Sequence, residues 1–200
     1  MKPAEQRVVT ELGAELRRVI RYDDESIVHD KWIRQRYEYG GSASYAPARA
    51  AAVQTAWHEA GHAVAALAVG ARFDSASIHH SASRHPGGGQ GRVRGITGAA
   101  ELAFAVDAAG QIAERLMNWT LLDRDEDLRA WLAAWRSDGD ARRFRRAVSQ
   151  CPGRDELSAW RYSERLLTER RLQVRQVARA LLVHPRYLTY GVVAAIAEAR

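Results

Sequence analysis

Two histidines and a glutamate lie close together in the apolar segment "TAWHEAGHAVAALAVG" (55–70). His58 and His62 are four residues apart, and at this spacing side chains share one face of a helix, about 5–6 Å apart at Cβ. Both imidazoles can therefore bind one metal ion, and Zn²⁺ is a common partner of histidine. Glu59 projects beside the metal, where it can take a proton from metal-bound water and pass it to a leaving amine.

The helix that carries these residues is otherwise rich in Ala, Val and Leu, so we expect it to be buried. The alternative is a buried helix whose two histidines form hydrogen bonds elsewhere. Burying two histidines and a glutamate together without a metal would be costly, because each polar group loses its hydration. The composition of the helix therefore favours a metal site.

The flanking pattern predicts the elements that position this motif. The helix should run over about 50–69, with Gly70 ending it. Residues 71–81 alternate small or apolar with polar types and predict a strand, and residues 91–98 predict a second one. The glycine-rich segment 82–90 between them predicts the turn of a β-ribbon.

Apolar residues at three- and four-residue spacing predict further helices. Residues 155–184 are expected to form one continuous helix, and a short helix should start at Thr189 or Gly191 and close the chain. The remaining predicted helices cover about 99–119, 125–135 and 141–150. The fold class expected from the pattern is mainly α, with one small β-ribbon.

The amino-terminal part is expected to be separate from the site. Residues 3–36 have apolar residues at helical spacing, and the glycine, serine and proline residues of 37–48 indicate a linker. We therefore divide the chain into an amino-terminal helix with its linker, 1–48, and a main domain, 49–200.

Composition excludes some classes of protein. Hydrophobic residues make up 46% and charged residues 27%, which is typical of a globular protein. The longest apolar stretch, 63–71, is shorter than the roughly 20 residues of a membrane span. The charged amino terminus does not resemble a signal peptide, and the single Cys151 fits a reducing compartment. We expect a cytoplasmic protein that does not associate with membranes.

The net charge of +6 comes almost wholly from arginine, since Lys2 and Lys31 are the only lysines. The densest cluster, "ARRFRRAV" (141–148), spreads its arginines around a helix surface, as on a solvated face. We therefore expect no nucleic-acid partner. A DNA-associated regulator that uses these arginines is the competing hypothesis, and its binding would weaken steeply with salt.

The segment "HEAGHAVAAL" (58–67) resembles the zinc helix of FtsH-type metallopeptidases. "DAAGQIAERLMN" (107–118) is similar to a glycine-containing helix of that family, with Gly110, Ala113 and Glu114 matching. The resemblance implies a helical, zincin-like peptidase domain with Zn²⁺ as cofactor, and a homo-oligomeric assembly. The sequence has no G-x-x-x-x-G-K-[ST] phosphate loop, so we expect a stand-alone, ATP-independent relative without the ATPase module or membrane anchor.

The same resemblance implies a third zinc ligand from a segment in which an aspartate opens a helix. "SDGDARRFRRAV" (137–148) matches that segment, and Asp140 is the first candidate because it directly precedes the arginine-rich helix and can cap it. Asp138, Asp127 and Glu114 are alternatives. If Glu114 is not a ligand, it can hold a zinc histidine by a hydrogen bond.

The resemblance also implies that an extended peptide pairs with an edge strand near the site, which gives affinity with little side-chain selectivity. The matching residues are Ser75, Ala76, Ser77 and Ile78. The expected function is hydrolysis of peptide bonds in peptides or unfolded proteins by a metal-activated water, with Glu59 as the catalytic acid and base. The alternative is a non-catalytic regulatory protein that binds zinc and retains the fold.

Overall fold

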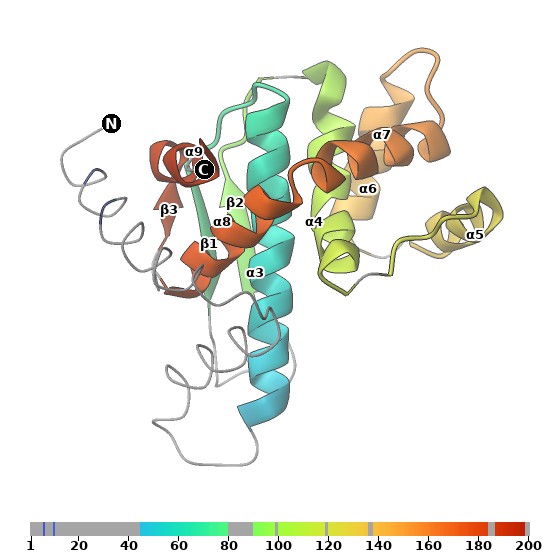
Figure 1. Cartoon of the computed structure of the whole chain (residues 1–200). Coiled ribbons are helices and arrows are strands. Elements are labelled where there is room, and N and C mark those ends of the chain that lie inside the picture. Colours follow the sequence, from blue (N-terminus) through green and yellow to red (C-terminus); the bar gives the residue numbers. More distant parts are fainter. Residues whose placement is uncertain are drawn as a thin grey trace.

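The computed structural model describes residues 45–198, apart from 80–89, 99, 119, 136–137 and 184–186, together with Gln6 and Thr10. Within these residues the protein is mainly helical with one small antiparallel sheet of three strands, which confirms the predicted fold class (Figure 1). The rest of the predicted amino-terminal helix, and all but Gln90 of the predicted turn, lie outside the described residues.

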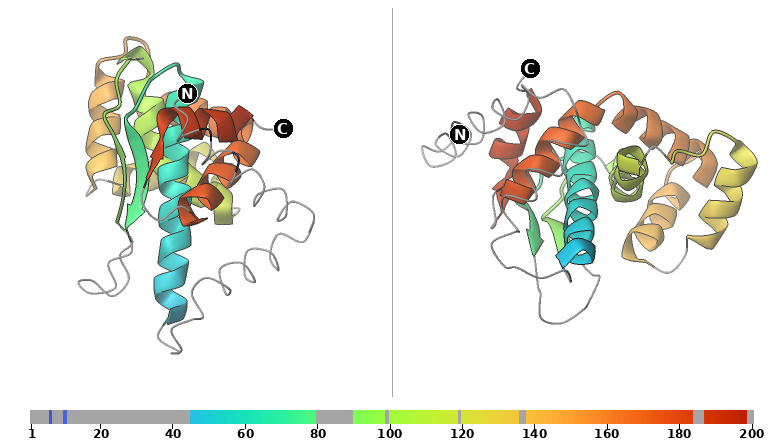
Figure 2. Two further views of the ribbon diagram at one scale, coloured as in Figure 1. Left: turned by 90° about the vertical axis from the view of Figure 1, so that its left-hand side faces the viewer. Right: turned by 60° about the horizontal axis from the view of Figure 1, so that its bottom comes forward.

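Helix α3 (Tyr45–Ala68) runs through the middle of the molecule. Figure 2 (right) shows it between α4 (Ala103–Asn118) on one side and the sheet with α8 (Arg171–Val183) and α9 (Tyr190–Glu198) on the other. It begins at Tyr45, inside the segment expected to be a linker. It ends as predicted at Gly70. The φ of this residue is 74°, a left-handed backbone conformation that glycine adopts without strain. Gly70 N–H donates to Leu67 O and Ala71 N–H to Ala66 O, which forms a Schellman cap.

The sheet has the order β2-β1-β3. Strand β1 (Ser75–His79) pairs with all of β2 (Gln90–Arg94) and, on its other side, with the two-residue β3 (Leu188–Thr189). The two longer strands were predicted. The third was not, because two residues are too few to show an alternating pattern.

Helix α4 (Ala103–Asn118), preceded by the 3₁₀ turn η2 (Ala100–Leu102), packs closely along α3. Gly61 makes this approach possible. A Cβ at Gly61 would lie 2.6 Å from Ala113 Cβ and would also clash with Ala109 O. The two helices therefore contact each other almost backbone to backbone.

The carboxyl-terminal half surrounds this pair. The segment 155–184 forms two helices, not the single one predicted, with the break at residues 169–170. Helix α7 (Glu156–Thr168) packs on α4 while α8 packs on α3, and one straight helix could not bury an apolar face on both. The elements of this half are α5 (Asp125–Ala134), α6 (Gly139–Ser149), α7 (Glu156–Thr168), α8 (Arg171–Val183) and α9 (Tyr190–Glu198). None of the described helices is long and apolar enough to cross a membrane.

The contact at Gly61 gives a first prediction. Alanine normally stabilises a helix interior by about 1 kcal/mol relative to glycine, but Gly61→Ala should destabilise this protein by about 1–3 kcal/mol through overpacking. Thermal unfolding should show a lower Tm, by about 2–4 °C for each kcal/mol lost. An unchanged or higher Tm would contradict the close approach of α3 and α4.

Candidate metal centre

Three side chains from two helices converge on one point. His58 Nε2 lies 3.0 Å from His62 Nε2, and Asp140 Oδ2 lies 2.9 Å from the first nitrogen and 3.2 Å from the second. Among the described residues, these three form the group whose ligand atoms could hold a metal ion together. His62 is buried, and the other two residues are half-buried. Helix α3 provides both imidazoles, and α6, which packs across α4, provides the carboxylate.

The outer nitrogen of each imidazole is fixed by an acceptor. His62 Nδ1 is 2.7 Å from the carbonyl oxygen of Val106, and His58 Nδ1 is 2.6 Å from Glu114 Oε1. Carbonyl and carboxylate oxygens only accept hydrogen bonds, so each Nδ1 carries the proton. In the neutral rings each Nε2 then carries a lone pair, and both lone pairs face the Asp140 carboxylate. The three atoms are therefore stable together only with positive charge between them, from a metal ion or from a further proton on an imidazole.

The donor set fits zinc. A tetrahedral zinc ion with bonds of about 2.0–2.1 Å holds its ligand atoms roughly 3.3 Å apart, close to the separations of 2.9–3.2 Å between these three atoms. Two imidazoles and one carboxylate are a catalytic type of ligand set, which leaves a fourth position for water or substrate. His58, His62 and Asp140 are thus the residues that could hold the metal.

The electrostatics of the site favour positive charge. Burial by itself lowers the pKa of His58, but hydrogen bonds to Asp140 and Glu114 outweigh it and raise this pKa to about 10. Burial opposes ionisation of Asp140, yet hydrogen bonds from both imidazoles lower its pKa below the usual range. Negative charge around the two rings therefore stabilises a cation at their centre.

The local structure of α6 explains why Asp140 is the aspartate that reaches the histidines. Asp138, not Asp140, caps the helix: its side chain accepts 2.6 Å hydrogen bonds from Ala141 N–H and from Trp135 Nε1. The expectation that Asp140 is the cap is therefore wrong. Asp140 lies in the first turn, two positions after the cap, and its side chain is not used for capping but contacts His58 and His62.

The other two alternative ligands lie elsewhere. Asp127 is exposed at the start of α5, where it faces Arg124 at 3.7 Å. Glu114 is not among the converging atoms, but its carboxylate accepts from His58 and also lies 2.5 Å from Gln54 Nε2. It matches the second prediction for this residue, a carboxylate that orients a histidine from outside.

Arg143 and Asp107 belong to the site and were missed in the sequence. Arg143 donates to Asp140 Oδ1, which leaves Oδ2 for the imidazoles, and its Nε lies 3.1 Å from Asp107 Oδ1 on α4. Burial raises the pKa of Asp107, while the charge of Arg143 opposes that rise. The arginine cluster was interpreted as a solvated face, although Arg143 stands three residues after Asp140, a spacing that permits an ion pair.

Glu59 lies beside the converging atoms and against β2. An added Cβ at Gly91 would stand 2.6 Å from Glu59 Cδ, so the carboxylate lies directly on the strand. The Val93 backbone also hydrogen-bonds to Glu59. Glu59 is buried, and burial raises its pKa although the charges of His62 and His58 partly offset this rise. A buried carboxylate with a raised pKa can both accept and return a proton.

Gly110 allows the imidazoles to pack on α4. A Cβ at this position would lie 2.6 Å from His62 Nε2 and closer still to His58 Nε2. Any larger residue would therefore occupy the space where the two nitrogens meet. The family resemblance singled out Gly110 but gave no reason for a glycine there. The packing of the two imidazoles against α4 supplies that reason.

The residues expected to bind substrate do not form the edge beside the site. Ser75 and Ala76 pair with β2 on one side and β3 on the other, while Ser77 and Ile78 pair with β2. The prediction that β1 is an edge strand is therefore wrong at Ser75 and Ala76, where the unpredicted β3 pairs with its second side. Figures 1 and 2 place β2 on the side of α4 and α6, and β2 is the strand that touches Glu59.

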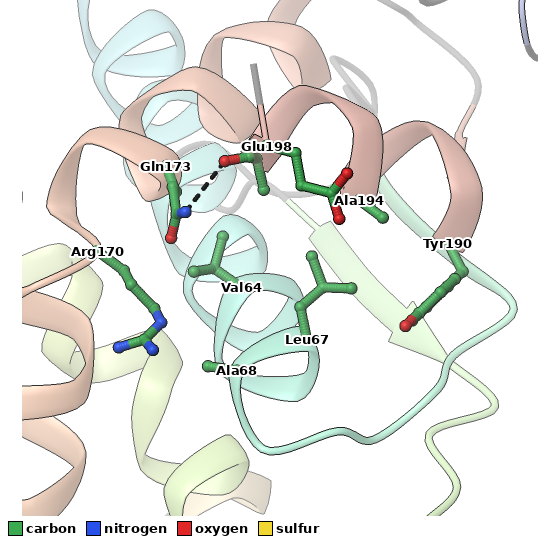
Figure 3. A pocket seen from close by; sticks show the side chains of 9 residues that line it. Val64, Leu67, Ala68, Arg170, Gln173, Tyr190, Ala194 and Glu198 are labelled. Atoms are coloured by element: carbon green, nitrogen blue, oxygen red, sulfur yellow. Dashed lines mark hydrogen bonds between the residues drawn. The ribbon is translucent and has the colours of Figure 1, made fainter. Parts of the chain in front are cut away.

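A pocket lies on a different face of α3 and shares no residue with the metal centre. Val64, Leu67 and Ala68 form one wall, and α8 and α9 form the other, where Gln173 Nε2 donates to Ala197 O at 3.0 Å (Figure 3). Of the remaining histidines, His80, His85 and His184 lie outside the described residues, as does the side chain of His79.

Comparison with known proteins gives one match. Residues 43–134, just under half of the chain, match the model of the Peptidase M50B-like family. This region includes His58, Glu59 and His62 and ends before Asp140. No curated protein and no solved structure matches the chain. The match supports a metallopeptidase family, as expected, but the matching family is not the FtsH type to which the sequence was compared.

The contacts of Arg143 give a prediction about metal affinity. Groups that orient a metal ligand typically contribute about 10–100-fold to metal affinity. Arg143 is more than half exposed, so we expect an effect at the lower end of this range. Arg143→Ala should therefore weaken Zn²⁺ binding about 10-fold. Competition with a fluorescent zinc chelator measures this Kd. Arg142→Ala removes an exposed arginine next to it and is the matched control. Equal Kd values for the two variants would contradict a role for Arg143 in holding Asp140.

Proposed function

We propose that this protein is a zinc-dependent metalloendopeptidase that hydrolyses peptide bonds without ATP. The observation that carries the proposal is the position of a buried glutamate, Glu59, beside a group of two imidazoles and one carboxylate that fits zinc. The match of residues 43–134 to a peptidase family supports it. The proposal does not depend on an FtsH-type assignment.

The proposed roles follow from the contacts. His58, His62 and Asp140 would hold zinc, which when bound supplies a Lewis acid that polarises a carbonyl oxygen and lowers the pKa of water. Glu114 and the Val106 carbonyl keep the proton of each histidine on Nδ1, so that each Nε2 faces inward. Arg143 holds the second oxygen of Asp140.

Glu59 would move the proton. Its carboxylate accepts a proton from the attacking water and then donates it to the nitrogen of the leaving amine. The Val93 backbone fixes this carboxylate at the strand, and Gly91 leaves the space for it. Burial excludes bulk water from Glu59 and raises its pKa, which makes the carboxylate a better acceptor for the proton of the attacking water.

The substrate we propose is an extended segment of a peptide or unfolded protein, lying along the outer edge of β2. This strand pairs with β1 on one side, and among the described residues no strand pairs with its other side. Main-chain pairing along a strand edge binds a chain in an extended form. The edge passes Glu59, so a peptide bound there would present its backbone to the centre.

Glu59→Gln tests the catalytic role. The amide keeps the size of the side chain and can still accept a hydrogen bond from Val93, but it cannot take a proton. We expect unchanged zinc content and a fall in casein cleavage of at least about 100-fold, the usual lower contribution of a general base. Zinc analysis and cleavage assays with and without chelator measure both. A wild-type protein that holds zinc and cleaves nothing would instead support the non-catalytic alternative.

Metal removal tests the site apart from catalysis. A metal that binds only the folded state stabilises it by about 2.7 kcal/mol when its free concentration is 100 times the Kd. For a chain of this length, Zn²⁺ added to metal-free protein should therefore raise Tm by about 5–10 °C. In His62→Ala this shift should disappear. A shift of the same size in that variant would place the stabilising zinc elsewhere.

A further inference from the structure

Strand β2 presents two arginines beside the proposed substrate edge. Arg92 and Arg94 alternate with Gly91 and Val93, and neighbouring side chains of a strand point to opposite faces. Gly91 faces Glu59 and Val93 packs on the core, so Arg92 and Arg94 point away from α3. Both arginines are exposed. The accessible face of the edge strand therefore carries two positive charges, two residues apart.

These charges are not neutralised within the described part of the chain. Neither Arg92 nor Arg94 forms an ion pair with a described carboxylate, although Asp74 lies nearby against Gly95. Several other arginines are paired with carboxylates: Arg124, Arg143, Arg145, Arg161 and Arg170. Two cations that no described carboxylate neutralises, on a strand edge that no described strand covers, favour an anionic partner.

We propose that the outer edge of β2 selects extended peptide segments with acidic side chains at alternate positions, of the form acidic-x-acidic. This inference rests on the proposed function and specifies its substrate. Side chains of paired strands stand about 4.5–5.5 Å apart when directly opposite, and opposite charges stabilise such a pair. Because faces alternate, acidic residues two positions apart reach the Arg92 and Arg94 face together, whereas adjacent acidic residues cannot.

The position of the two arginines favours a peptide over a nucleic acid. They stand on the strand whose Val93 backbone and Gly91 hold Glu59, so whatever binds along this edge passes the proposed catalytic carboxylate. An extended polypeptide can use both the edge and the charges, while a nucleic acid backbone would use the charges alone.

Binding to zinc-loaded, full-length Glu59→Gln tests the proposal, because it requires no turnover. Fluorescence anisotropy would compare labelled peptides of one length that contain Glu-x-Glu, Glu-Glu or Gln-x-Gln. We expect Glu-x-Glu to bind about 3- to 10-fold more tightly than Gln-x-Gln, and more tightly than Glu-Glu of the same net charge. The preference should weaken as salt is raised.

Further variants of the Glu59→Gln protein test whether Arg92 and Arg94 cause the preference. Replacing Arg92 and Arg94 with alanine should remove the preference of Glu-x-Glu over Gln-x-Gln. Arg129→Ala with Arg165→Ala removes two exposed arginines on α5 and α7, so it is matched in charge and should keep the preference. Loss of the preference in this control would show a general effect of charge and overturn the inference.

The outcomes separate the two proposals. If wild-type protein never cleaves peptides but the Arg92- and Arg94-dependent preference is found, the proposed function fails and the binding inference stands. Equal binding of all three peptides overturns the inference, whether or not cleavage occurs. Tighter binding of a single-stranded oligonucleotide than of Glu-x-Glu, lost on removing Arg92 and Arg94, also overturns it and assigns the edge to nucleic acid.

Discussion

The arrangement of the molecule around its centre depends on three acceptor atoms that face one another. The Nε2 atoms of His58 and His62 stand 3.0 Å apart, and Asp140 Oδ2 lies within 3.2 Å of both. When both rings are neutral and hold their proton on Nδ1, these atoms repel one another unless a metal ion or a further proton lies among them. Such a cluster is costly to shield from water without that positive charge, and its spacing fits zinc.

Close packing of α3 on α4 makes that arrangement possible. Gly61 brings the two backbones together, and Gly110 leaves the space in which the imidazole nitrogens meet. Helix α4 also supplies the Val106 carbonyl, Glu114 and Asp107, which hold His62, His58 and Arg143 in turn. One helix thus provides both histidines and its neighbour provides most of their orientation. A small shift between the two helices would disturb every one of these contacts together.

The features that depend on local sequence pattern could be predicted. The helix with His58, Glu59 and His62, its end at Gly70, and the two longer strands could be foreseen from spacing and turn residues. The break between α7 and α8 could not, because it depends on which neighbour each half packs against.

In the candidate metal centre, too, local spacing could be predicted from the sequence but contacts between distant segments could not. The motif histidines and Glu59 are close in the chain, so local spacing brings them together. Asp138 and Asp140 can each cap α6 or bind a metal, and local sequence does not decide which does which. The structure uses Asp138 as the cap, and this leaves Asp140 to contact the histidines. Arg143 lies in a run of arginines, and its pairing with Asp107 on α4 spans 36 residues of chain. That β3 covers β1 at Ser75 and Ala76 could not be foreseen, because β3 comes from the far end of the sequence.

The direction of Glu59 links the metal centre to the sheet. Consecutive residues of a helix are separated by about 100° around its axis, so a side chain next to His58 must leave the histidine face. Here it points to β2, where Gly91 and the Val93 backbone receive it. Asp140 approaches the histidines from α6, carried by a separate part of the fold. Under the proposed function, a substrate lying along this strand would meet Glu59 and the two exposed arginines of β2 together, so one edge would serve binding, orientation and proton transfer.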